Sequence, residues 1–394
     1  MPPATSAPAD VEAHQALAQR LMGVFTRAGY ERIEPAIIQP ADVLLDVVGE
    51  DLRARTYVFT DPEGAELCLR PDLTVPTCRV HLERHPQGSE PARYCYSGSA
   101  FRYQSMSADR AHPREFRQAG IESFAAPDRE QDDAAVCALT IAALRETGLQ
   151  ELSLRTGDLG LFNALINALP IPERWRRRLK HQFWRPEAFR AELNRLTSGG
   201  AGHSPGLPRA LIERLDPGDP DAAEALVLEH LDQEGIELIG TRSAAEIAER
   251  LMAEAADMRE HPLPRETAAL IESYVGVKAP AREAVARVDG LLRGRGIDIS
   301  AGLAAFRRRL DLLAQAGVDL SAAEFSAEFG RNLEYYTGFV FEVIAPAMGP
   351  KSPVAGGGRY DELLADVGAP TDVPAVGSSI HTERLFALLQ EAAQ

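Results

Sequence analysis

The chain has 394 residues, of which 45% are hydrophobic and 25% are charged. This composition is ordinary for a globular protein and excludes disordered and fibrous classes. With 58 acidic against 42 basic side chains, the formal charge is -16, which argues against a broad surface that follows nucleic-acid phosphates. The longest apolar runs fall far short of the roughly 20 residues that span a bilayer, and residues 1–10 lack the pattern of a secretory signal.

Four cysteines, Cys68, Cys78, Cys95 and Cys137, are scattered over the N-terminal part of the chain. No two of them have the C-x-x-C spacing of a zinc site, and four thiols in so long a chain do not make a disulfide framework. We therefore expect buried thiols in a cytoplasmic protein that binds no metal, no cofactor and no membrane.

Hydrophobic periodicity and turn residues predict alternating strands and helices up to about residue 157. In chain order, the expected elements are a helix at 10–28, a strand at 33–38, a hairpin of 56–60 and 66–70, a helix at 71–85, strands at 92–97, 99–104 and 114–125, a helix at 128–147 and a strand at 152–156. Strands joined by hairpins, with helices packed outside, indicate a mostly antiparallel α+β sheet rather than a doubly wound one.

The middle of the chain is expected to be almost entirely helical. A basic segment inside it, 174–178, has two interpretations: a solvated helix face, or a docking surface for an acidic partner or a phosphate. We expect residues 158–317 to form a largely helical insertion, with residues 1–157 and 318–394 together forming the core around the sheet.

The C-terminal part returns to strands. The expected elements are strands at 318–329 and 337–344, a glycine-rich loop at 356–358, a helix at 359–367, a strand at 375–381 and a helix at 382–393. The sheet is therefore predicted to form from both ends of the chain.

Two short polar segments could carry chemistry. Asp72 and Thr74 lie at a strand-to-helix turn, where their oxygens could cap the helix or accept hydrogen bonds from an ammonium group. Residues 330–338 place charge and two tyrosines directly before an expected strand. Either segment by itself could also be ordinary surface structure.

A third group lies on two expected strands. Gln118, Gly120 and Glu122 share one face, since alternate residues of a strand point the same way. A gap between an amide and a carboxylate suits a small polar ligand, and Arg102 on the neighbouring strand could bind the anionic group of that ligand.

Taken together, these segments resemble the histidyl-tRNA synthetase family of class II synthetases. Five segments carry the resemblance: Pro35 for motif 1, 101–104 with 114–122 for motif 2, 330–338 for the second histidine signature, 355–361 for the glycine-rich segment, and 375–385 for motif 3. Several signatures in one order make the match specific, and it covers about 10–157 and 318–394. It implies a class II synthetase-like antiparallel sheet flanked by helices, and a dimer formed through motif 1.

The resemblance also implies a set of histidine-binding positions, none of them catalytic. These are Asp72, Thr74, Arg102, Gln118, Glu122, Arg331, Tyr335 and Tyr336. In the family pattern, Asp72, Thr74 and Gln118 would receive the α-ammonium group of histidine.

The remaining positions would hold the other two ends of the amino acid. Glu122 and Tyr336 would bracket the imidazole, while Arg102 and Arg331 would face the carboxylate. Histidine offers a cation, an anion and a ring that both donates and accepts, and this set provides a partner for each.

Three departures from the family pattern affect the nucleotide more than the histidine. Motif 2 has Gln104 where the family has a glutamate. In motif 3, His381 replaces a glycine, and its imidazole would occupy space that a ligand needs. The E-G-T signature is here 72–74, enlarged at the glycine position. The chain ends about ten residues after motif 3, so no anticodon-binding domain and no tRNA partner are expected.

Loss of ATP features together with a tRNA-reading domain is similar to the synthetase-like regulatory subunits of ATP phosphoribosyltransferase. The resemblance implies a non-catalytic subunit that forms a dimer, assembles with the short-form catalytic subunit, and mediates feedback inhibition by L-histidine at the first step of histidine biosynthesis. One alternative is a truncated synthetase-like enzyme that activates histidine with ATP. Another is a histidine sensor with an unrelated target.

Overall fold

The computed structural model describes most of the chain, which forms two compact units. Unit 1 combines residues 1–165 with 275–394, and unit 2 comprises residues 166–274. The described residues are 8–45, 47, 49–104, 113–199, 209–216, 218–235, 243–329, 335–349 and 352–392. Unit 1 is therefore built from both ends of the chain.

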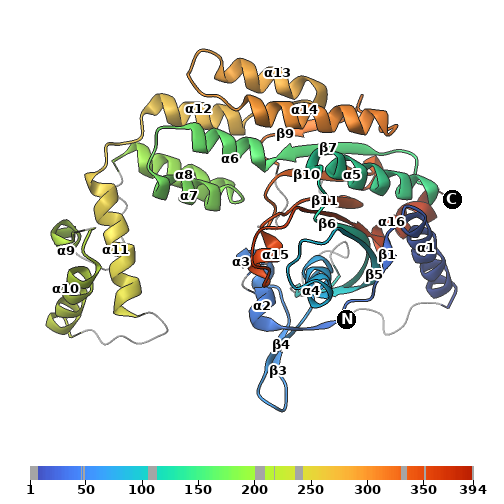
Figure 1. Cartoon of the computed structure of the whole chain (residues 1–394), viewed down its shortest axis with the longest axis horizontal. Helices are drawn as coiled ribbons and strands as arrows, with labels where there is room; N and C mark the ends of the chain where they lie inside the picture. The colour runs from blue at the N-terminus through green and yellow to red at the C-terminus, as the bar shows by residue number, and fades with distance from the viewer. Residues whose placement is uncertain are drawn as a thin grey trace. The chain divides into compact units, whose positions relative to one another are not determined.

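Within these described ranges, a nine-stranded sheet forms the centre of unit 1, in the order β1-β5-β6-β12-β11-β10-β7-β9-β8. Figure 1 labels several of these strands, among them β5, β6, β10 and β11. Its strands are β1 (Glu31–Arg32), β5 (Ala92–Phe101), β6 (Glu115–Phe124), β7 (Ser153–Asp158), β8 (Lys278–Pro280), β9 (Glu324–Ser326), β10 (Phe339–Ile344), β11 (Ala355–Arg359) and β12 (Ala375–His381). The pairs β1–β5 and β7–β9 are parallel, and the other neighbours are antiparallel. The predicted α+β class and mostly antiparallel sheet are confirmed.

Helices of unit 1 pack against this sheet and against one another. α5 (Arg129–Glu146) packs on β10, β11 and β12, and α14 (Ser300–Gln315) packs on α5. α1 (Pro8–Arg27) packs against α5 and α16 (Thr382–Ala392). The further helices of this unit are α2 (Ala41–Leu45), α3 (Gly49–Arg53), α4 (Thr74–Arg84), α6 (Leu159–Ala168), which continues into unit 2, α13 (Ala281–Leu292), α15 (Leu363–Asp366) and the 3-10 helix η1 (Pro346–Met348).

A second, smaller sheet has the order β2-β4-β3, with β2 (Ile38–Pro40), β3 (Val58–Thr60) and β4 (Glu66–Leu69). The hairpin predicted between β3 and β4 is confirmed. Oδ1 of Asp61 accepts hydrogen bonds from the backbone N–H groups of Glu63 and Ala65, both at 2.9 Å. The aspartate side chain thus closes the turn, as its local hydrogen-bonding tendency predicts. All four cysteines are buried and free, as expected.

Several predicted strands are wrong in extent. Residues 33–38 are extended only at their end, where β2 begins. Two strands predicted at 92–97 and 99–104 are one continuous strand, β5, and of residues 318–329 only β9 is a strand. The cause is common to all of them: strand ends depend on pairing partners rather than on local residue preference.

The glycine triplet, residues 356–358, lies inside β11, so the loop predicted for it is wrong. A Cβ atom at Gly357 would lie 2.2 Å from the carbonyl oxygen of Gly377, and one at Gly358 would lie 2.8 Å from the carbonyl oxygen of Phe339. Only glycine permits neighbouring chains to approach this closely. The predicted helix at 359–367 shortens to α15, because β11 occupies its expected beginning.

Unit 2 is helical over its described residues. Its helices are α7 (Glu173–Gln182), α8 (Pro186–Thr197), α9 (Arg209–Arg214), α10 (Pro220–Gln233), α11 (Ala244–Arg259) and α12 (Arg265–Val275). Asp257 of α11 is fully buried and accepts hydrogen bonds from Arg174 at 2.7 Å and from the indole of Trp175 at 2.6 Å, and it also pairs with Arg178. These two arginines of the basic segment 174–178 therefore point to an internal carboxylate.

Candidate functional site

A small polar pocket lies on the face of the main sheet that points away from α5. Ser123 of β6 and Ser378 of β12 hydrogen-bond to side chains of α5. Because consecutive strand residues point to opposite faces, Glu122 and Gly377 point to the other side. The pocket residues are Asp72, Thr74, Arg102, Gln118, Tyr335, Tyr336, Gly377, Ser378 and Ser379.

This pocket brings together most of the residues proposed from the sequence. Six of the eight line it: Asp72, Thr74, Arg102, Gln118, Tyr335 and Tyr336. Glu122 lies directly behind the lining, and Arg331 lies outside the described residues. Segments that are hundreds of residues apart in the chain thus converge on one small volume.

Asp72 provides the buried carboxylate of the pocket. It lies before α4 and is 3% exposed. Its carboxylate accepts long hydrogen bonds, both of 3.4 Å, from the backbone N–H of Val75 and from the hydroxyl of Tyr335. Burial raises the pKa of the Asp72 carboxyl above its ordinary value, while the guanidinium of Arg102 acts in the opposite direction. The carboxylate contacts the first turn of α4 and also lines the pocket, so its position is compatible with both interpretations of Asp72.

Gln118 supplies an acceptor whose bonding capacity is not used. Its side chain is 3% exposed, and its Nε2 donates to Oγ of Ser379 at 3.3 Å. Among the described residues, Oε1 of Gln118 has no hydrogen-bond partner. A buried acceptor left unpaired costs about 1–3 kcal/mol, so a ligand that donates a hydrogen bond to this oxygen would recover that free energy.

Glu122 lies at the floor of the site, where three hydroxyl groups surround its carboxylate. Oε1 accepts from Thr74 and from Tyr96, both at 2.9 Å, and Oε2 accepts from Tyr360. Burial raises the pKa of Glu122 to about 8, and the three hydroxyls oppose that rise only in part. Thr74 therefore connects the pocket surface with a carboxyl that is itself only 1% exposed.

Gly120 does not leave an open gap, contrary to the expectation from the strand pattern. Tyr96 on the adjacent β5 fills it: a Cβ atom at Gly120 would lie 2.5 Å from the tyrosine hydroxyl. The space that glycine provides lets the hydroxyl of Tyr96 reach Glu122. Gly377 on the adjacent β12 likewise leaves space for the carboxylate of Glu122, since a Cβ there would lie 1.5 Å from Oε2 of Glu122.

Three tyrosine rings form an aromatic wall beside this carboxyl, defined as Tyr335, Tyr336 and Tyr360. The ring centroids of Tyr335 and Tyr336 are 5.1 Å apart, and those of Tyr335 and Tyr360 are 5.7 Å apart. Such separations are typical of favourable aromatic pairs. The free space of the pocket is about 10 Å³, enough for about one water molecule, so a larger ligand requires lining side chains to move.

A second, larger cavity of about 180 Å³ shares Arg102 with the first. It is lined by Arg55, Arg102, Gln104, Pro113, Phe116, Met348, His381, Glu383, Arg384 and Ala387. The guanidinium of Arg102 lies 5.1 Å from the ring of Phe116, and the imidazole of His381 lies 5.7 Å from the same ring. The cavity is smaller than the roughly 300–1,000 Å³ of common ligand sites, and His381 and Gln104 both occupy its lining.

Sequence reasoning missed Tyr96, Tyr360 and Ser379. Tyr96 has the strand position opposite Gly120, and Tyr360 follows the glycine triplet by two residues, so both were visible as large residues beside small ones. In the described part of the chain, no cluster of three or more His, Cys, Asp or Glu residues could hold a metal ion. Over the same part, no helix combines the length and apolar character needed to cross a membrane.

Comparison with known proteins decides the family. The protein-family model described as histidyl-tRNA synthetase matches residues 4–202 and 252–385. ATP phosphoribosyltransferase regulatory subunits from Brucella anthropi and Mesorhizobium japonicum are 34% and 36% identical, over 92% and 96% of this chain and 94% and 98% of theirs. The chain belongs to the family of ATP phosphoribosyltransferase regulatory subunits. The resemblance inferred from the sequence motifs is confirmed.

Solved structures agree on the fold. A structure from Bacillus halodurans C, described as an ATP phosphoribosyltransferase regulatory subunit/histidyl-tRNA synthetase, matches with a TM-score of 0.67 at 20% identity, covering 97% of this chain and 80% of the other. Histidyl-tRNA synthetase from Nostoc sp. PCC 7120 matches with a TM-score of 0.62 at 17% identity, covering 100% and 77%. The class II synthetase-like fold predicted for this chain is therefore confirmed.

Proposed function

We propose that the chain is the non-catalytic regulatory subunit of a cytoplasmic ATP phosphoribosyltransferase and makes the first step of histidine biosynthesis sensitive to L-histidine. The family membership carries this proposal, because relatives with this name match almost the full length of the chain. In this proposal the chain forms a dimer, binds the short-form catalytic subunit and binds no tRNA.

The chemistry of the pocket supports L-histidine as its ligand. Asp72 and the unpaired Oε1 of Gln118 offer acceptors for an ammonium group. Arg102 offers a cation for a carboxylate, and the aromatic wall beside Glu122 offers a ring surface and a hydroxyl network for an imidazole. All three ends of the amino acid would find a partner of the right kind.

Lack of catalysis is proposed from the second cavity. A class II enzyme needs room for a nucleotide, and here His381 and Gln104 line a cavity of about 180 Å³. The role of the chain would then be thermodynamic: histidine bound in the pocket must favour one arrangement of the assembly over another, commonly by about 1–3 kcal/mol.

Assembly is tested by mixing the purified chain with the short-form catalytic subunit and measuring the mass by size-exclusion chromatography with light scattering. We expect one hetero-oligomer, in which phosphoribosyl transfer is enabled or raised and becomes sensitive to L-histidine. Two separate peaks, with a transfer rate unaffected by this chain, would contradict the proposal.

Location of the histidine site is tested by calorimetry with Gln118→Ala and the exposed control Gln131→Ala. The first variant removes the unpaired acceptor and should weaken L-histidine binding by about 1–3 kcal/mol, whereas the control should not change it. Wild-type affinity in Gln118→Ala, measured on a complex that remains inhibited by histidine, would place the sensor outside this pocket.

A further inference from the structure

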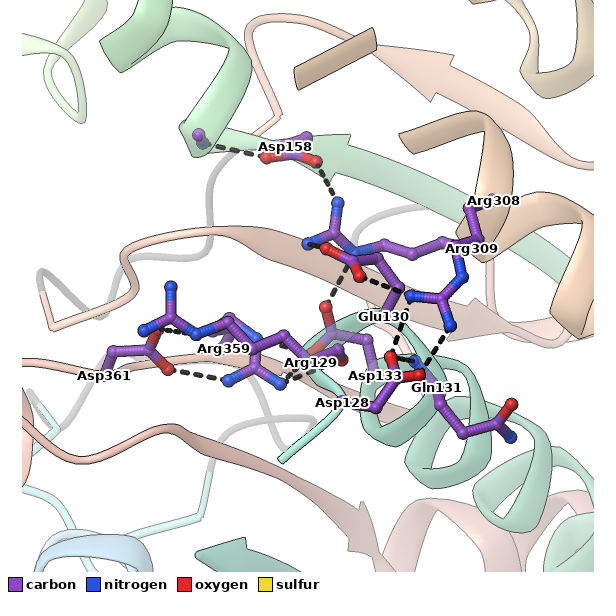
Figure 2. A network of polar contacts seen from close by, with 11 residues as sticks. Asp128, Arg129, Glu130, Gln131, Asp133, Asp158, Arg308, Arg309, Arg359 and Asp361 are labelled. Atoms are coloured by element: carbon purple, nitrogen blue, oxygen red, sulfur yellow. Dashed lines mark hydrogen bonds and ion pairs between the residues drawn. The ribbon is translucent and has the colours of Figure 1, made fainter. Parts of the chain in front are cut away.

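A cluster of buried charges connects β11 to α5 and α14, on the side of the main sheet opposite the pocket (Figure 2). Asp133 of α5 accepts hydrogen bonds from Arg309 of α14 at 2.6 Å and from Arg359 of β11 at 2.8 Å. Arg309 also binds Asp158 at the end of β7, at 3.1 Å. No member of this set is more than 7% exposed.

The two buried arginines of this cluster have four carboxylate partners, because Arg309 also lies 3.8 Å from Glu130 and Arg359 also binds Asp361. The cluster continues to the surface at one end, where Arg308 pairs with Asp128 and with Glu130, and its side chain is 47% exposed (Figure 2). Among the described residues, the arginines and aspartates of this cluster already bind one another, so the cluster offers no unpaired group to a ligand. The cluster can act instead by holding a segment of the chain in place.

Stability alone does not account for such a cluster. Burying paired charges costs desolvation free energy, and replacing both partners by apolar residues of similar volume is often neutral or stabilising. Removing one partner is different, because it leaves a buried charge without compensation. A buried ion pair can instead specify one arrangement of the chain, here that of the segment in contact with Arg359.

Arg359 and its neighbours fix the segment that bears the aromatic wall. The backbone carbonyl of Arg359 accepts from the N–H of Thr337 at 2.8 Å, and the N–H of Asp361 donates to Oγ1 of Thr337 at 3.0 Å. Thr337 directly follows Tyr336. A Cβ on Gly338 would lie only 3.3 Å from Cδ of Arg359, so this side chain also packs beneath the segment.

The same short stretch orients the third ring of the wall. Arg359 points toward α5 and Tyr360 points toward the pocket, as expected for consecutive residues of an extended chain. The guanidinium of Arg359 also binds the carboxylate of Asp361 at 2.7 Å, and that carboxylate accepts from the backbone N–H of Ala375 at 2.9 Å. Any shift of Arg359 would therefore move Tyr360 relative to Glu122.

We propose that Arg359, held by Asp133, is a positioning residue for the ligand pocket and sets the geometry in which the aromatic wall meets Glu122. This inference rests on the proposed histidine site and adds the device that keeps it in shape. It also provides a mechanical link between the pocket and α5 and α14 on the other face of the sheet.

The test is the double variant Asp133→Leu/Arg359→Met, which removes one charge of each sign. It leaves Arg309 paired with Asp158, and Asp361 paired with Arg129. The matched control is Arg308→Met, at the exposed end of the same cluster. Calorimetry with L-histidine should show a dissociation constant raised about tenfold or more in the double variant, with unchanged binding stoichiometry and an unchanged unfolding midpoint. The control should bind as the wild type does.

A merely structural role would lower the stoichiometry or the unfolding midpoint and leave the dissociation constant of the folded fraction unchanged. That result, or an affinity within twofold of the wild type, would overturn the inference. If the double variant does not fold, Arg359→Lys takes its place. Lysine keeps the charge but cannot bind Asp133 and Asp361 through separate guanidinium nitrogens. Absence of binding by the wild type would instead refute the histidine site itself, and the positioning role with it.

Discussion

The hydroxyl of Tyr360 donates a hydrogen bond to Oε2 of Glu122, a residue 238 positions earlier in the chain. Tyr360 directly follows β11 and Glu122 belongs to β6, and these two strands are separated in the sheet by β12. Gly377 of β12 is the register partner of Glu122, and the absence of a side chain there leaves the space that the carboxylate occupies. The floor of the pocket therefore depends on a glycine between a tyrosine and a glutamate.

Substituting this glycine should damage the site and the fold together. In Gly377→Ala, the new methyl group would overlap Oε2 of Glu122, so we expect a loss of about 1–3 kcal/mol in the free energy of unfolding and weaker histidine binding. Gly290→Ala in α13 is the matched control, since nothing lies within 4 Å of its added Cβ. Urea unfolding should show the control equal to or more stable than the wild type. Equal stability of the two variants would contradict the close packing at Gly377.

Glu122 should make stability depend on pH in an unusual direction. Its folded-state pKa is raised to about 8 from an ordinary 4.5, so between these values the folded chain holds a proton that the unfolded chain has lost. The free energy of unfolding therefore falls as pH rises through this window, by at most about 1.4 kcal/mol per pH unit from this group. In Glu122→Gln this contribution should disappear, so the difference between variant and wild type grows toward pH 8.

The measurement is denaturant unfolding at a series of pH values from 5 to 8. Glu63→Gln, at an exposed position of the β3–β4 turn, serves as the control and should keep the wild-type profile. Parallel profiles for wild type and Glu122→Gln would show that the carboxyl of Glu122 titrates in the folded chain as it does in the unfolded one.

Asp257 should be the most sensitive charge in unit 2. It pairs with Arg174, Arg178 and Arg195, so Asp257→Ala would leave these guanidiniums without their shared buried carboxylate. A loss of about 1–3 kcal/mol is expected, because a buried acceptor is removed while Glu260 and Glu192 still pair with the arginines. Hydrogen exchange should speed up in α7, α8 and α11. Asp289→Ala, which breaks an exposed pair on α13, should change stability by no more than about 1 kcal/mol.

The purified chain should show no histidine-dependent exchange of pyrophosphate into ATP. His381 and Gln104 line the cavity where a nucleotide would be needed, although Arg102 and Arg384 line it as well. A histidyl-tRNA synthetase assayed in parallel provides the positive control. Robust exchange by this chain would favour the alternative of a truncated synthetase-like enzyme over the regulatory role.

The amino-acid sequence by itself determined the fold class, the hairpin at Asp61 and the family. Turn chemistry and hydrophobic period are local properties, so they can be recognised without knowing what packs where. The ordered motifs also predicted one site for eight residues, and six of these line one pocket in the structure. A sequence motif identifies residues that belong to one site, but it does not specify the contacts between them.

Only the tertiary structure decided how those residues meet. Glu122 could face a ligand directly or be enclosed, and it is enclosed by hydroxyls from three separate segments: Thr74, Tyr96 and Tyr360. The glycine triplet could form a loop or a strand. It forms a strand because it pairs with β10 and β12, whose carbonyl groups lie too close for any side chain there. Both outcomes depend on contacts between residues distant in sequence, whose free energies no local pattern contains.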